Sequence, residues 1–295
     1  MNILISGASG FIGRHLSNFL SGQGYKVFSL QRKEPSNPPY WNIDKNVVDL
    51  GKCNQIDVVI HLAGENIASG RWTKKKKEKI ESSRIKGTKL LCEYVSSLKN
   101  KPKLLISASA IGFYGDRGEE TLTEDSPKGT GFLADVCKKW EKETRIALNS
   151  GIRVVNMRFG MVLSPYCGAL KKMLIPFRLG LGGVIGTGKQ YISWISIEDV
   201  LGAIYHIIKD ENMIGPINFV SPNPVTNRYF TKTLAQILHR PALIPLPSLM
   251  VQVLLGEMAN ELLLSSTKVI PKKLIYSGYS FRYSSLESTF KTYFK

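Results

Sequence analysis

Paired cysteines, acidic residues and long apolar runs are scarce in this 295-residue sequence. The four cysteines are scattered and form no CxxC pair, which argues against a zinc cluster or a disulfide framework and favours a reducing compartment. The longest uncharged stretch, between Arg240 and Glu257, is interrupted by prolines and is shorter than the ~20 apolar residues that a membrane span needs. No charged segment precedes the apolar N-terminus, so we expect no signal peptide. We therefore expect a cytoplasmic protein without a metal site.

The scarcity of acidic residues leaves a net charge of +17, from 40 lysines and arginines against 23 aspartates and glutamates. Such a charge attracts phosphate groups on nucleic acids, membranes or small ligands. The lysines are spread from Lys26 to Lys295, however, and the single run, Lys74–Lys77, has no nucleic-acid motif beside it. We therefore expect no nucleic-acid and no membrane partner. A weaker alternative, binding to a phosphate backbone, would require an affinity that falls steeply with salt.

The sequence does contain a regular alternation of apolar strands and amphipathic helices. We predict strands at Asn2–Ser6, Lys26–Leu30, Val58–Leu62, Lys103–Ser107 and Arg153–Met157, and helices at Arg14–Ser21, Lys75–Ser97, Leu133–Asn149, around Thr231–Leu238 and in an apolar stretch through Leu264. This order predicts an α/β protein with a Rossmann doubly wound parallel sheet and a smaller C-terminal α/β substrate lobe. We place the nucleotide-binding domain at residues 1–163 and about 192–222, and the lobe at about 164–191 and 223–295.

The turn after the first strand is rich in glycine. It reads Gly7-Ala8-Ser9-Gly10-Phe11-Ile12-Gly13, a GxxGxxG spacing between a strand and a helix. The first glycine permits the tight turn, the second lets the backbone approach a pyrophosphate, and the third lets the helix pack closely on the strand. Amides at the helix N-terminus can then bind the phosphate charge. The pattern predicts dinucleotide binding.

The end of the second strand predicts which dinucleotide is bound. NAD-binding proteins usually place an acidic residue there to accept hydrogen bonds from the ribose hydroxyls. This chain reads Ser29-Leu30-Gln31-Arg32-Lys33, with no acidic residue before Glu34. An arginine can hold a 2′-phosphate through two parallel hydrogen bonds. We therefore predict NADP as the cofactor.

Further motifs occur in a specific order, although each motif alone is weak. Besides the glycine turn they are HLAGENI at His61–Ile67, Arg71-Trp72, SRIKGT at Ser83–Thr88, SASAIGFYGDRG at Ser107–Gly118, PFRLGLGG at Pro176–Gly183, WISIEDV at Trp194–Val200 and VIPKKLIYSGYSF at Val269–Phe281. The ordered set resembles the epimerase branch of the extended short-chain dehydrogenases/reductases, in particular its atypical members with a characteristic C-terminal tail domain. The resemblance covers the whole chain.

This resemblance implies an NADP-binding domain, a cleft for a nucleotide-sugar-like or other polar small molecule, and dimerisation through two helices. It implies that Gly7, Ser9, Gly10, Phe11, Ile12 and Gly13 line the pyrophosphate turn, that Gln31 and Arg32 face the adenosine ribose and its phosphate, that Leu62, Ala63 and Gly64 pass the adenine and ribose, and that Val162 lies at the nicotinamide end. Where relatives commonly have an asparagine, this chain has Arg84, which could reach the cofactor phosphates.

The chain departs from its relatives at the catalytic pair. They use Tyr-x-x-x-Lys, in which the lysine lowers the tyrosine pKa so that the phenol exchanges a proton with substrate. The matching positions here are Leu133 and Cys137, and no register places a lysine four residues after a tyrosine. The candidate substitutes are Ser109, Tyr114 and Lys138, although Tyr114 also fits a packing role.

Two functional hypotheses follow. The first is an NADP-dependent oxidoreductase or epimerase of unusual mechanism, in which the cofactor carries the chemistry. The second is a non-catalytic NADP-binding sensor that reports cofactor state, which the absent Tyr-Lys pair favours.

Overall fold

The structure, a computed structural model, describes residues 1–32, 38–51, 53 and 55–295. Its centre is a parallel six-stranded sheet in the order β12-β8-β6-β5-β1-β2. The strands are β1 (Asn2–Ser6), β2 (Lys26–Leu30), β5 (Val58–His61), β6 (Leu104–Ala110), β8 (Arg153–Phe159) and β12 (Gly215–Phe219). The strand order reverses at β1, and ligands of such sheets bind at the carboxyl ends of the strands beside that reversal. The predicted Rossmann doubly wound sheet is confirmed.

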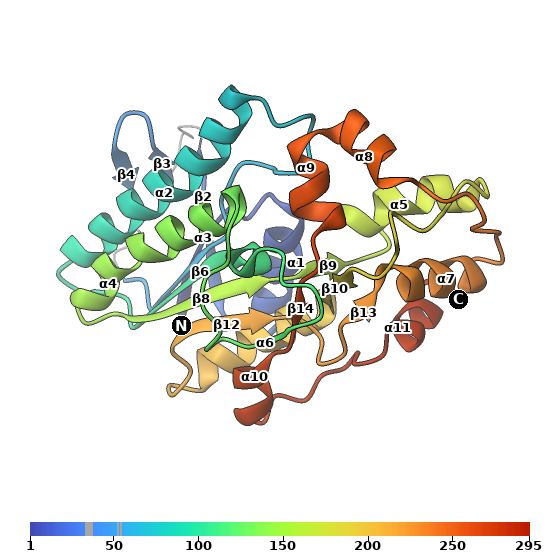
Figure 1. Ribbon diagram of the computed structural model, residues 1–295. Helices are drawn as coiled ribbons and strands as arrows, with labels where there is room; N and C mark the ends of the chain where they lie inside the picture. Colours follow the sequence, from blue (N-terminus) through green and yellow to red (C-terminus); the bar gives the residue numbers. More distant parts are fainter. Residues whose placement is uncertain (33–37, 52, 54) are drawn as a thin grey trace.

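Helices cover both faces of the sheet (Figure 1). On one face, α1 (Phe11–Gly22) and α6 (Ile197–Lys209) pack against Ile3 and Ile5 of β1. On the other, α2 (Lys74–Ser97) and α4 (Arg145–Asn149) pack against Leu4, with α3 (Phe132–Glu143) beside α2. Because side chains alternate along a strand, one uniformly apolar strand supplies both layers of the core.

The remaining elements are mostly short and form the outer part of the molecule. They are β3 (Tyr40–Asn42), β4 (Val47–Asp49), η1 (Ile111–Tyr114), β7 (Thr121–Leu122), β9 (Met161–Leu163), α5 (Gly168–Arg178), β10 (Tyr191–Ile192), β11 (Trp194–Ser196), β13 (Val225–Thr226), α7 (Asn227–Ile237), α8 (Ser248–Leu255), α9 (Glu257–Ala259), η2 (Asn260–Leu264), β14 (Lys268–Val269), α10 (Lys272–Tyr276) and α11 (Leu286–Tyr293). Side chains of α5, α7 and α11 share an apolar cluster with Leu163 of β9 and Trp194 of β11. The division into two domains stays a prediction. Within the described residues, no helix combines the length and apolarity needed to cross a membrane.

Helix α6 and strand β12 are missing from the sequence prediction, and three further differences concern other helices. The helix predicted over Leu133–Asn149 is two helices that meet at Thr144, whose buried hydroxyl donates to the Glu141 carbonyl oxygen at 2.7 Å. The stretch through Leu264 is divided at Gly256, which adopts a φ of 63°. The third is α5, which we did not predict because Gly168 and Pro176 frame it like a loop.

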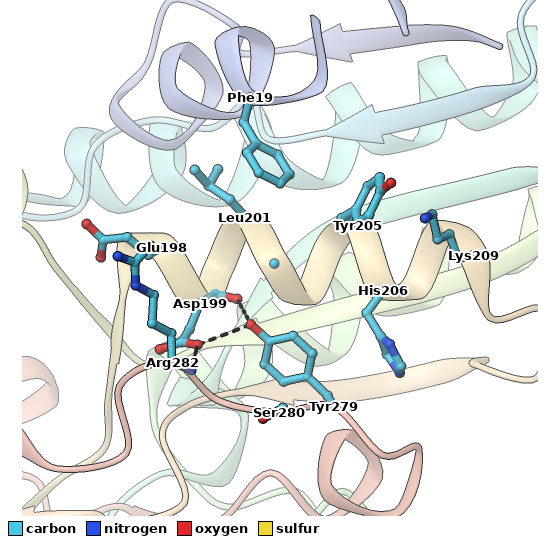
Figure 2. A pocket seen from close by; sticks show the side chains of 11 residues that line it. Phe19, Glu198, Asp199, Leu201, Tyr205, His206, Lys209, Tyr279, Ser280 and Arg282 are labelled. Atoms are coloured by element: carbon cyan, nitrogen blue, oxygen red, sulfur yellow. Dashed lines mark hydrogen bonds between the residues drawn. The ribbon is translucent and has the colours of Figure 1, made fainter. Parts of the chain in front are cut away.

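Asp199, from the WISIEDV motif, attaches the C-terminal segment to α6 (Figure 2). One oxygen of this fully buried carboxylate accepts hydrogen bonds from the Tyr279 hydroxyl at 3.1 Å and the Arg282 amide at 2.7 Å. The other accepts from the Ser196 hydroxyl and the Tyr283 amide. A hollow of about 510 Å³ lies beside these residues, and none of the predicted cofactor or catalytic residues lines it.

Candidate functional site

The glycine-rich turn lies at the carboxyl end of β1, where the strand order reverses. Gly7 has a φ of 74°, and a Cβ atom there would lie 2.8 Å from the Ala63 nitrogen, in the segment after β5. The Gly10 amide donates to the Gly7 carbonyl oxygen, and Gly10 begins α1 without a side-chain cap. The first turn of α1 contains no acidic residue. The helix therefore presents unpaired amides and a positive dipole end to a phosphate.

The end of β2 carries the two residues predicted to face the adenosine. Gln31 and Arg32 are both exposed. The charge of Arg32 contributes to lowering the pKa of Glu65, although the hydrogen bond from Lys76 is the larger cause. The charge of Arg32 therefore reaches Glu65, in the segment after β5. Lys33 and Glu34 lie outside the described residues.

Leu62, Ala63 and Gly64 follow β5 and border the turn, and Arg84 of α2 lies beneath them. One guanidinium nitrogen of Arg84 donates to the carbonyl oxygens of Glu65 and Ile80, each at 3.1 Å. Burial lowers the pKa of this guanidinium. Arg84 thus fixes the backbone of the segment after β5. Its second terminal nitrogen, Nη2, makes no hydrogen bond within the described residues.

Val162 of β9 lies beside the start of α5. A Cβ atom on Gly168 would lie 3.4 Å from the Phe11 ring and 3.7 Å from the Val162 carbonyl oxygen. Phe11 and Val162 also pack against the same apolar cluster. The structure thus brings the predicted nicotinamide-end residue close to the far side of the pyrophosphate turn.

The Lys74–Lys77 run forms the first turn of α2 and is partly neutralised. Lys76 binds Glu65 at 2.6 Å, and Lys77 binds Glu257 of α9 at 2.7 Å. These pairs connect the segment after β5 and the C-terminal lobe to one helix end.

His61, at the end of β5, is completely buried. Its ring nitrogens contact the hydroxyl oxygens of Ser6 at 2.6 Å and Thr88 at 3.0 Å, and the Trp140 indole donates to the same Thr88 oxygen. Burial, assisted by the charge of Arg84, lowers the pKa of His61 to about 4. The histidine is a neutral member of the core.

This burial predicts a loss of stability in mild acid. The unfolded chain binds a proton at His61 near pH 6.5 and the folded chain only near pH 4, so stability falls as the pH drops between these values, by up to about 3 kcal/mol. In urea unfolding at several pH values, the difference in free energy of unfolding between the wild type and His61→Asn should therefore shrink as the pH falls through this window. A difference that is constant with pH would contradict the assignment.

At the carboxyl end of β6, Ser109 is part of a buried charged cluster. Its hydroxyl donates to Oε1 of Glu141, on α3, at 2.7 Å. Arg158 of β8 binds both carboxylate oxygens of Glu141 at 2.8 Å. Burial lowers the pKa of Arg158, but its hydrogen bonds to Glu141 outweigh this and raise it above its ordinary value. Arg158 therefore stays charged, and its guanidinium faces the Glu141 carboxylate.

Tyr114 packs against this cluster. It is fully buried, donates to Asn218 Oδ1 at 2.7 Å and accepts from Arg158 at 3.0 Å. Burial raises its pKa to about 12 although Arg158 acts in the opposite direction. This environment favours the packing role over that of a catalytic acid.

Lys138 does not approach Ser109. It is exposed, whereas Leu133, Cys137 and Glu141, at successive four-residue intervals, lie on the face of α3 directed at the sheet. Burial raises the pKa of Cys137 to about 12, which excludes a reactive thiolate at the position of the family lysine. Lys138 is therefore not the partner of Ser109. The side chain that contacts the Ser109 hydroxyl is Glu141.

The N-terminus of α3 is occupied by Glu261 of η2. The two oxygens of this carboxylate accept hydrogen bonds from the amides of Phe132 at 3.0 Å and Leu133 at 3.3 Å. The C-terminal lobe thus holds α3 at the position where relatives carry the catalytic tyrosine.

Sequence reasoning missed the roles of Glu141, Arg158 and Glu261. The four-residue spacing of Leu133, Cys137 and Glu141 could have placed Glu141 on the sheet-facing side of α3. Nothing local indicates Arg158 or Glu261, because β8 and η2 meet α3 only through the tertiary fold.

Comparison with known proteins places these features in a family. Residues 3–220 match the NAD dependent epimerase/dehydratase family, and residues 246–292 match a domain of unknown function, DUF1731. The chain therefore belongs to the NAD-dependent epimerase/dehydratase family, and the resemblance to its members with a C-terminal tail domain is confirmed.

Among individual relatives, the epimerase family protein YfhF of Bacillus subtilis is 41% identical, over 97% of this chain and 96% of that protein. The crystal structure of the human epimerase family protein SDR39U1 (isoform 2) with NADPH is similar with a TM-score of 0.91 and 34% identity, covering 99% of both chains. UDP-glucuronic acid 4-epimerase from Bacillus cereus, in complex with UDP-glucuronic acid and NAD, has a TM-score of 0.75 at 20% identity, covering 100% of this chain and 98% of that one. This last likeness shows the fold alone.

Proposed function

We propose that this protein is an NADP-dependent oxidoreductase or epimerase in which Ser109 and Glu141 replace the missing Tyr-Lys pair. The observation that carries the cofactor is the uncapped, acid-free N-terminus of α1 at the reversal of the strand order. The human relative was crystallised with NADPH, whereas the UDP-glucuronic acid 4-epimerase was crystallised with NAD. Arg32, with no acidic residue before Glu34, favours NADP.

The described residues fit such a cofactor. Gly7, Gly10 and Gly13 leave the backbone of the turn free of Cβ atoms, so the amides of α1 can reach the pyrophosphate. Arg32 would hold the 2′-phosphate, and Phe11 and Val162 would border the nicotinamide end. When bound, the nicotinamide accepts or donates a hydride.

The hydrogen-bond direction at Ser109 defines what the protein itself can do. Because the Ser109 hydroxyl donates to Glu141, its oxygen lone pairs are free to accept a hydrogen bond from a substrate hydroxyl. As that hydroxyl is oxidised, its proton would move to Ser109 Oγ while the serine proton moves to Glu141. Carbonyl reduction would move the protons back. Arg158 holds both oxygens of the Glu141 carboxylate in place.

The substrate class remains a proposal. Family membership and the C-terminal lobe support a nucleotide-sugar-like or other polar small molecule with a secondary hydroxyl. A homodimer and the exclusion of nucleic acid stay predictions.

Cofactor preference tests the proposal directly. In a calorimetric titration, the protein should bind NADPH more tightly than NADH, and Arg32→Ala should weaken NADPH binding about ten- to a hundredfold while leaving NADH unchanged. Lys26→Ala, at the opposite end of β2, is the control and should change neither. Equal affinities for both cofactors in the wild type would exclude the assignment.

The second candidate function is the non-catalytic NADP sensor, favoured by Leu133 and Cys137 at the catalytic positions and by the buried Tyr114. Incubation with a panel of nucleotide sugars and either cofactor form, followed by absorbance, separates the two. For an enzyme, Ser109→Ala should lower turnover at least about a hundredfold without changing NADPH affinity, and Ser82→Ala should change neither. Tight NADPH binding without turnover on any member of the panel would support the sensor.

A further inference from the structure

The C-terminal lobe exposes an unusual concentration of large apolar side chains. Nine of the seventeen exposed large apolar side chains of the described residues lie within residues 175–181, 243–244 and 249–254, and we call these nine the apolar patch. On α8, Leu249 is 70% exposed and Val253 is 65% exposed, while only Val251 is buried. Single exposed apolar residues are normal on a soluble protein, but a concentration of this kind marks an interaction surface.

The three segments of the apolar patch are held beside one another. The Leu246 amide donates to the Val184 carbonyl oxygen at 2.9 Å, and the Gly186 amide donates to the Leu246 carbonyl oxygen at 2.8 Å. This pairing fixes the loop after α5 against the segment that leads into α8. Figure 1 shows α5 and α8 on the same side of the molecule, away from α4. The apolar patch is therefore one surface of the fold.

The charge around the apolar patch has a single sign. Residues 144–197 and 212–256 contain no aspartate or glutamate. The stretches 164–191 and 223–256, which include the apolar patch, contain seven lysines and arginines: Lys171, Lys172, Arg178, Lys189, Arg228, Lys232 and Arg240. On α5, Lys171, Lys172 and Arg178 are exposed on the same side as Ile175. None of the seven takes part in an ion pair within the described residues. The excess of positive charge is thus concentrated on this lobe, which its even spread along the sequence concealed.

From this juxtaposition we propose that the apolar patch and its cations dock onto an anionic lipid surface. Apolar side chains enter the boundary between headgroups and acyl chains, while lysines and arginines bind the lipid phosphates. The eight residues of α8 rise only about 12 Å, so the contact lies at the surface of the bilayer. The proposal replaces the expectation of no membrane partner, which rested on composition alone.

Sedimentation with lipid vesicles tests this docking. The full-length protein should sediment with vesicles of phosphatidylcholine and phosphatidylglycerol and much less with phosphatidylcholine alone. The double variant Leu249→Glu and Val253→Glu should weaken binding about tenfold or more, because two exposed anchors become anions without loss of helix propensity. Leu148→Glu with Ile214→Glu changes two apolar residues outside the patch that are 54% and 58% exposed, and should bind as the wild type does.

The cations are tested in the same assay. Lys171→Gln with Arg178→Gln should weaken binding to the anionic vesicles about tenfold or more. Lys89→Gln with Lys99→Gln removes the same charge from α2 and from a position two residues beyond its end, and should have little effect. Equal losses in both pairs would show a general effect of net charge and overturn the proposal. Absence of vesicle binding would also overturn the proposal. If the wild type is then a dimer in analytical ultracentrifugation and Leu249→Glu with Val253→Glu dissociates it, the surface belongs to a second copy of the chain.

Discussion

Replacing Glu141 by alanine should lower the free energy of unfolding by about 3–5 kcal/mol, because it leaves the Arg158 guanidinium buried without its counter-ion. The side chain of Arg158 is only 4% exposed, and Glu141 accepts from two of its nitrogens. The remaining partner, the Tyr114 hydroxyl, carries no charge at neutral pH, since the pKa of Tyr114 is raised to about 12. Chemical denaturation of the wild type and the variant measures the difference.

Two further variants separate charge burial from packing. Glu141→Leu with Arg158→Met removes both charges and keeps apolar volume, so its stability should return to within about 1 kcal/mol of the wild type. Its turnover should stay low, because Ser109 has lost the acceptor for its proton. Lys89→Ala with Glu93→Ala removes an exposed pair on α2 and should cost less than about 0.5 kcal/mol. A loss below about 1 kcal/mol in Glu141→Ala itself would show that water reaches the cluster and that the buried relay is wrong.

The contrast between the glycine turn and the Ser109 cluster shows what a sequence can predict. The glycine turn is local, since its strand, three glycines and helix follow one another, and spacing alone identified its place. The Ser109 cluster joins β6, α3 and β8, so it depends on the register that sets Ser109 opposite Arg158. The sequence around α3 favoured Lys138 as a nearby cation. The helix directs that lysine to solvent and Glu141 inward.

The sequence did not predict that the apolar side chains of α8 are exposed, for a similar reason. The segment between Arg240 and Glu257 is apolar on every side, and such a pattern is as typical of a buried helix as of an uncovered one. Only the tertiary structure shows that α8 buries Val251 alone. The absence of acidic residues across residues 212–256 was visible, but it acquired a meaning once these residues were found beside α5.

The second large effect is expected at Gly13, where alanine should abolish measurable NADPH binding and also destabilise the apoprotein. A Cβ atom at Gly13 would lie 2.7 Å from the Ala8 Cα and closer still to the Gly7 carbonyl oxygen. Both atoms are backbone and cannot rotate away, so α1 has to move off the turn. Overpacking of this kind costs about 1–3 kcal/mol. In addition, the variant forgoes the stabilisation of about 2.7 kcal/mol that a cofactor supplies at a hundred times its dissociation constant.

Thermal unfolding with and without NADPH distinguishes these two losses. Gly10→Ala, whose Cβ atom would lie 3.2 Å from the same Gly7 oxygen, should keep a reduced shift with NADPH, since the neighbouring backbone has to move less. Gly22→Ala, at the other end of α1, meets nothing within 4 Å and should gain about 0.5–1 kcal/mol in stability with a full cofactor shift. The effects of the three alanines on NADPH binding should therefore decrease as the distance from the added Cβ atom to the Gly7 carbonyl oxygen increases. A general loss of glycine flexibility would not produce this order. Identical NADPH shifts in all three would mean that the pyrophosphate is held elsewhere, and that the amides of α1 do not bind it.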